Sequence, residues 1–108
     1  MGFVYLIVQI DSDGMECHKI GISKNNPEIR LKNLKTGNSN QLRIINTYES
    51  DNYRKIERWL HRKYYNSKTL ADNEFFNLTN EQVLSFIDDC KEIDNTISFL
   101  KENNVFYK

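Results

Sequence analysis

Two apolar runs near the N-terminus predict a β-hairpin. The first extends from Phe3 to Ile10 and is apolar on both faces, which is typical of a central strand. A turn signal, Asp-Ser-Asp-Gly, separates it from a second run over Cys17 to Ser23. If Ile10 faces Gly14 across a three-residue loop, the register sets Tyr5 opposite Lys19 on the odd-numbered face.

A helix and a third strand follow the hairpin. Asn26 and Pro27 are typical of a helix start, with Asn as the N-cap and Pro at the first helical position. Gly37 closes this helix, and Arg30 lies beside its apolar stripe, from which it can reach an edge of the sheet. The apolar positions over 42–48 then predict a short strand.

A second helical pattern begins after residue 50. Ser50 or Asp51 is expected to cap a helix that runs to about Tyr65. Glu57 and His61, four residues apart, share one face of this helix beside its apolar stripe. The residues expected on the core side are Tyr53, Ile56, Leu60 and Tyr64.

The C-terminal part contains an extended apolar segment and a capped helix. Residues 74–78, Glu-Phe-Phe-Asn-Leu, predict a short extended clip. Thr79 and Gln82 have the spacing of a capping box, which predicts a helix through about Asp89. That helix is either continued or succeeded by an acidic amphipathic helix through Leu100. No repeat or linker interrupts the elements, so their order indicates one α/β domain.

Length and composition agree with one domain and exclude several classes of protein. The chain has 108 residues, 39% of them hydrophobic and only one a proline, so it is neither collagenous nor disordered. Its longest apolar run is far shorter than the ~20 residues of a membrane helix, and no basic residue precedes that run as in a secretory signal. Cys17 and Cys90 lie far apart, which excludes a disulfide scaffold and a zinc finger. We therefore expect a cytoplasmic protein without membrane association.

The formal net charge is zero, but the charges are unevenly distributed. Residues 19–68 hold twelve basic and four acidic side chains, a net charge of +8, while residues 1–18 carry −3 and residues 69–108 carry −5. A basic block interleaved with aromatic and amide side chains is typical of a phosphate-contacting face. The alternative is that these bases only solvate two helices. Asn, Lys and Ile make up 35 residues and Ala one, a bias that indicates an AT-rich genome such as that of a phage or virus.

Five residues are candidates for chemistry: Tyr5, Lys19, Arg30, Glu57 and His61. Each alone has an ordinary structural explanation. The Tyr can be a core aromatic, the Lys and Arg solvated bases, the Glu an ion-pair partner and the His a half-buried helix residue. Their order and context, however, resemble the GIY-YIG nuclease superfamily.

The resemblance rests on motifs spread over residues 3–87. They look like the small phage-type subgroup of the superfamily, which is often described only as a DNA-binding domain. The chain departs from the superfamily pattern in two places. Phe3-Val4 replaces Gly-Ile, and Lys19 replaces the second tyrosine, where several branches also carry a lysine. The motifs are Val4-Tyr5-Leu6-Ile7, Lys19-Ile20-Gly21-Ile22-Ser23, Asn26-Pro27-Glu28-Ile29-Arg30-Leu31, Leu34-Lys35-Thr36-Gly37-Asn38, Ile56-Glu57 with Leu60-His61, and Glu74-Phe75-Phe76-Asn77-Leu78.

The resemblance implies an α+β fold in which a three-stranded antiparallel sheet is flanked by helices. It divides the chain into a nuclease-like part over 1–87 and an acidic helical extension over 88–108, packed on or next to it. It also implies a single Mg²⁺ or Mn²⁺ ion held by Glu57, with Tyr5, Lys19 and Arg30 at catalytic positions. His61 is a further candidate, as a group behind the metal ligand, as a base or as a residue that packs under the clip. Asn66 resembles the asparagine that ends the core of some members.

These roles agree with the chemistry of in-line phosphodiester hydrolysis. One carboxylate suffices as the protein ligand of a divalent metal when phosphate and water complete the oxygen shell. Arg30 would grip the phosphate with a bidentate fork. Tyr5, whose pKa is ordinarily about 10, must be near positive charge to act as a base. Lys19 could supply that charge, position the water or act as the base itself.

The leading prediction is a metal-dependent DNA endonuclease. Its specificity is expected to come from a targeting partner protein, a homodimer or DNA shape, because no targeting domain is recognised in the chain. The alternatives are a DNA-binding module that does not cleave and a phage protein that binds a host enzyme through its acidic tail. The residues expected to contact DNA are Lys24, Lys32, Lys35, Arg54, Arg58, Arg62 and Lys63.

Overall fold

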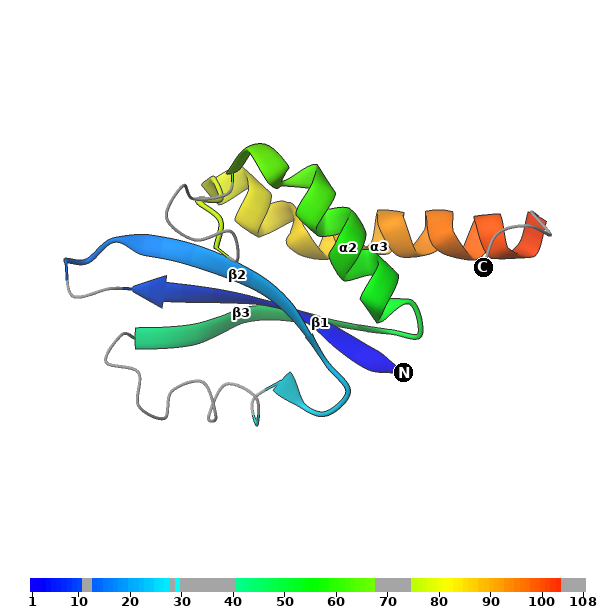
Figure 1. The fold of residues 1–108 in the computed structure, drawn as a ribbon, viewed down its shortest axis with the longest axis horizontal. Coiled ribbons are helices and arrows are strands. Elements are labelled where there is room, and N and C mark those ends of the chain that lie inside the picture. Colours follow the sequence, from blue (N-terminus) through cyan, green and yellow to red (C-terminus); the bar gives the residue numbers. More distant parts are fainter. Residues whose placement is uncertain (11–12, 28, 30–40, 68–74, 104–108) are drawn as a thin grey trace.

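The computed structural model describes residues 1–10, 13–27, 29, 41–67 and 75–103 as an α+β fold. The elements are β1 (Gly2–Ile10), β2 (Glu16–Ser23), β3 (Gln41–Ser50), α2 (Tyr53–Lys63), the 3₁₀ turn η1 (Tyr65–Ser67) and α3 (Asn80–Asn103). The three strands form an antiparallel sheet of order β2-β1-β3, and α2 and α3 lie on one of its faces (Figure 1). Helix α2 packs on β2 and β1, and α3 packs on α2 and β3.

Strand β1 is central and buried on both faces, as its two-sided apolar pattern predicts. Its even-numbered residues, such as Leu6, join a core that contains Ile56 and Leu60 of α2. Tyr5 and Ile7 point to the opposite face and pack in a second cluster with Leu42. The predicted core side of α2 is confirmed, since Tyr53, Ile56, Leu60 and Tyr64 are all buried.

The predicted hairpin register is wrong by two residues. Tyr5 pairs with Gly21, and Lys19 pairs with Ile7. The reason is the length of the turn, because β2 begins only at Glu16. Gly14 therefore lies inside the turn, where its φ of +79° adopts the left-handed conformation that glycine tolerates. An even shift leaves Tyr5 and Lys19 on the same face, as diagonal neighbours instead of a direct pair.

The N-cap of α2 is Asn52, not the predicted Ser50 or Asp51. Ser50 instead accepts the backbone N–H of Asn52 on its hydroxyl oxygen at 3.0 Å. The Asn52 side chain makes no capping bond and donates to the Asp94 carboxylate at 2.7 Å. A contact with α3, distant in sequence, has thus displaced the local cap.

Helix α3 is one continuous helix of 24 residues, the continued form of the predicted arrangement. The capping box is confirmed, because Gln82 accepts the N–H of Thr79 at 2.8 Å and donates its own N–H to the Thr79 hydroxyl at 3.2 Å. The predicted division after residue 87 falls inside this helix and stays a prediction.

The predicted helix over 26–37 lies mostly outside the described residues. Pro27 and Ile29 are helical, and the Ile29 N–H donates to the Asn26 carbonyl at 3.0 Å. Within the described parts of the chain, no helix has the length and hydropathy that crossing a membrane requires.

Candidate functional site

A pocket of about 260 Å³ lies at the edge strand β2, where α2 passes beside it. Four of the five sequence-predicted chemical residues line it, and the fifth, Arg30, is outside the described residues. Residues far apart in the chain therefore meet as the motif order predicts. The lining consists of Tyr5, Lys19, Ile20, Gly21, Ile22, Glu57 and His61.

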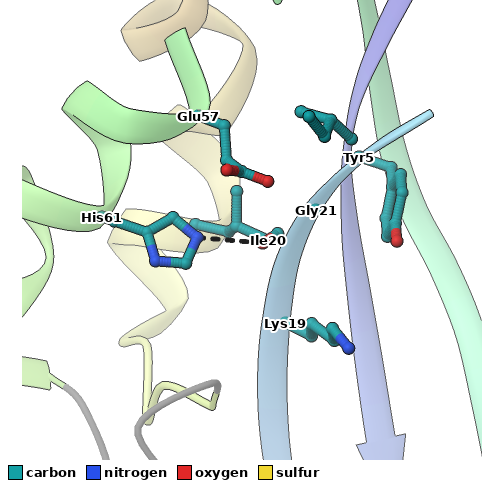
Figure 2. Close-up of a pocket in the computed structure, with 7 residues that line it drawn as sticks. Tyr5, Lys19, Ile20, Gly21, Glu57 and His61 are labelled. Atoms are coloured by element: carbon teal, nitrogen blue, oxygen red, sulfur yellow. Dashed lines mark hydrogen bonds between the residues drawn. The ribbon is translucent and has the colours of Figure 1, made fainter. Parts of the chain in front are cut away.

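The pocket residues approach β2 from its two sides. Figure 2 shows Glu57 and His61 on the side of α2, while Tyr5 and Lys19 point away from that helix. Gly21 lies between the two groups and has no side chain to separate them. A substrate in this pocket would therefore lie across the bare backbone of the edge strand at Gly21.

Gly21 also determines where the Tyr5 ring can lie. The two residues pair directly across the hairpin, and a Cβ atom built on Gly21 would lie only 2.4 Å from the Tyr5 hydroxyl oxygen. The Tyr5 ring thus occupies the space over the glycine and is only 2% exposed. Gly21 was not among the candidate residues predicted from the sequence, although a glycine inside a strand often marks the close approach of another group.

Glu57 is the carboxylate of the pocket. It is half-buried, and this burial raises its pKa above the ordinary value, while the positive charges of His61, Arg58, Arg54 and Lys19 act in the opposite direction. Among the described residues, no group of three or more His, Cys, Asp or Glu side chains could hold a metal ion. The Glu57 carboxylate by itself offers oxygen ligands, so it could hold a hard cation whose other oxygen ligands come from water and phosphate.

His61 makes two defined contacts at the pocket wall. Its Nε2 lies 3.0 Å from the carbonyl oxygen of Ile20 on β2. Its ring meets the edge of the Phe76 ring at a centroid distance of 5.1 Å. The contact with Phe76 agrees with the packing role under the clip, one of the roles that the sequence left open for His61.

Lys19 and the clip complete the outer side of the strand. The Lys19 ammonium lies 6.0 Å from the centre of the Phe75 ring. Phe76 pairs with His18 through two backbone hydrogen bonds, at 2.7 and 2.8 Å. The predicted extended clip thus pairs with the edge of β2 through one residue, Phe76. This pairing holds the strand at His18, directly before Lys19.

The predicted DNA-binding residues that the structure describes lie mainly on α2. Arg54, Arg58 and Arg62 are exposed and four residues apart, so they follow one another along the solvent side of the helix. Lys63 instead forms an ion pair with Asp89 of α3 at 3.6 Å. Lys24 is exposed just after β2, Asn66 is exposed in η1 and does not line the pocket, and Lys32 and Lys35 lie outside the described residues.

Comparison with known proteins identifies a family but no individual relative. No curated protein and no solved structure matches the chain. Residues 2–91 match the T5orf172 domain, a span that includes every residue of the pocket and all three strands. The chain therefore belongs to the T5orf172 domain family, which is generally regarded as GIY-YIG-like.

Proposed function

We propose that the protein is a metal-dependent endonuclease that hydrolyses DNA phosphodiester bonds. The observation that carries the proposal is the Glu57 carboxylate, which an arginine-rich helix holds half-buried in a pocket with Tyr5 and Lys19. The family to which the chain belongs is GIY-YIG-like and nuclease-related, and this membership supports the same class of reaction. A cytoplasmic location is part of the same proposal.

Three residues of the pocket, together with Arg30, are proposed to have roles that their chemistry allows. Glu57 would hold Mg²⁺ or Mn²⁺, which when bound neutralises charge that develops on the phosphate and the leaving oxygen. Tyr5 lies on the opposite side of β2, where its phenolate form would take a proton from the attacking water and become the phenol. The Lys19 ammonium would stabilise the phenolate before that transfer, and Arg30 is proposed to bind the scissile phosphate.

The exposed arginines of α2 are proposed to bind the DNA backbone around the pocket. Arg54 and Arg58 are close enough to Glu57 for their charges to oppose the rise in its pKa that burial causes. A phosphate bound between the two arginines would therefore lie beside the carboxylate. Contacts of this kind are electrostatic and independent of base sequence. A partner protein or a second copy of the chain would then have to supply target specificity.

Cleavage of supercoiled plasmid in Mg²⁺ or Mn²⁺ tests the proposal. We expect the Glu57→Gln variant to lose cleavage and Mn²⁺ binding, since the amide keeps the shape of the side chain but not its charge. Glu49→Gln, which neutralises an exposed carboxylate on β3, is the matched control and should cleave like the wild type. Arg30→Ala should retain Mn²⁺ binding and lose cleavage.

The result that would contradict the proposal is a wild type that cleaves in neither metal. Retarded migration of DNA that weakens with salt would then identify a binding module without catalysis. Absence of both activities would exclude DNA as the ligand.

A further inference from the structure

The His61 imidazole is the point where three segments of the chain meet. It is carried by α2, four residues after Glu57, and its Nε2 lies 3.0 Å from the Ile20 carbonyl of β2. Its ring packs edge-on against Phe76, which is itself paired to β2 at His18. Helix, edge strand and clip are therefore tied together beside the pocket.

The hydrogen bond at Ile20 determines which tautomer the neutral ring adopts. A carbonyl oxygen can only accept a hydrogen bond, so the Nε2 of His61 must carry a proton and donate it. In the neutral ring the lone pair then lies on Nδ1. The atom that faces the strand is thus a fixed donor and cannot accept a proton from water.

The anchored peptide lies in the middle of the site. Ile20 stands between Lys19 and Gly21, and Gly21 supports the Tyr5 ring. A bond from α2 to this carbonyl therefore fixes the distance between the helix that carries Glu57 and the strand that carries Lys19 and Gly21 (Figure 2).

We propose that His61 is a positioning residue of the site and not its base: its Nε2–H holds β2 at Ile20, so that Glu57 faces Tyr5 and Lys19 across Gly21 at a fixed separation. The part of this proposal that concerns cleavage rests on the proposed nuclease function. The Phe76 ring keeps the imidazole in the orientation that the bond needs, because edge-to-face contact restricts its rotation.

Nuclear magnetic resonance of the wild type tests the inference without cleavage. We expect ¹⁵N shifts of the His61 ring to identify the Nε2–H tautomer. The ¹³C carbonyl shift of Ile20 should move in the direction of a lost hydrogen bond in His61→Asn. It should stay near its wild-type value in His61→Gln, whose amide nitrogen can reach the place of Nε2. An Nδ1–H tautomer, or an Ile20 shift unchanged in His61→Asn, would overturn the proposal.

Cleavage kinetics of the same variants, each checked for an unchanged melting temperature, form the second arm. His61→Gln should remain within about threefold of the wild-type kcat, whereas His61→Asn should lose about 10²-fold, the effect of a misplacement of about 1 Å. The KM and the shape of the pH profile should not change in either variant. Equal loss in both variants, together with a missing ionisation in the pH profile, would identify His61 as an acid or base instead. A wild type that does not cleave would refute the proposed function, while the resonance arm would still decide whether His61 holds the strand.

Discussion

Replacement of Gly21 by alanine tests the packing on which the pocket depends. The added methyl group would lie 2.4 Å from the Tyr5 hydroxyl oxygen and 2.6 Å from the adjacent ring carbon. Real Cβ atoms do not approach other atoms so closely, and the Tyr5 ring is rigid and only 2% exposed, so it cannot turn aside freely. The ring must move, and its hydroxyl must leave its place at the pocket wall.

The expected loss of stability follows from two opposing effects. Overpacking of a buried site costs about 1–3 kcal/mol. A Gly→Ala change at a compatible backbone position returns about 0.4–1 kcal/mol through the unfolded state, and Gly21 has no positive φ that would forbid alanine. We expect a net loss of about 1–2 kcal/mol, which in a chain of this length lowers the Tm by roughly 4–8 °C. Cleavage should also fall, since the phenol is displaced.

A double-mutant cycle in urea isolates the contact. If the methyl group strains the fold only by meeting the ring, Gly21→Ala should cost little in a Tyr5→Leu background, with a coupling energy of about 1 kcal/mol or more. Gly14→Ala is the control, because nothing lies within 4 Å of its Cβ position and its φ of +79° strains any alanine. Its cost should be the same with or without Tyr5. Additive losses at Gly21 and Tyr5, or a more stable Gly21→Ala protein, would refute the reasoning.

Three further changes test other parts of the structure. Burial lowers the pKa of His18, so the folded protein takes up its proton less readily than the unfolded chain, and the free energy of unfolding should fall as the pH drops below about 6.5. Urea titrations of His18→Leu should show a flatter pH dependence, and an unchanged slope would exclude His18 as its source. Asp94→Ala should lose about 1–3 kcal/mol in urea, because its carboxylate accepts three hydrogen bonds from β3 and the start of α2, whereas the exposed Asp88→Ala should not. Equal stability of the two Asp variants would contradict this. Arg58→Ala should reduce the salt dependence of DNA binding by about one counterion, unlike Arg43→Ala on β3, and an unchanged slope would place the DNA elsewhere.

The local pattern of the sequence predicts most of the secondary structure. The apolar positions of β1 and the core side of α2 follow from periods of 2 and 3.6 residues, which any fold must respect. The capping box at Thr79 is equally local, because its two hydrogen bonds join residues three apart. The same spacing argument placed Glu57 and His61 together, and both line the pocket.

The parts that the sequence did not predict depend on one turn conformation and on contacts between distant residues. The hairpin register was wrong because the conformation of Gly14 sets the length of the turn. The cap of α2 was misassigned because Asp94, 42 residues away, binds the Asn52 side chain. The contact of His61 with Ile20 could not be foreseen for the same reason, since no periodic pattern connects a helix residue to one carbonyl of an edge strand.

The two sides of α2 differ in how their charges are neutralised. Glu57 and Lys63 are six positions apart and so lie on different sides of the helix. Lys63 faces α3 and pairs with Asp89, so the acidic helix neutralises that flank. The flank with Glu57 borders the pocket, and Arg58 next to Glu57 is exposed. We therefore expect a polyanion to approach α2 from the Glu57 side, although the chain as a whole carries no net charge.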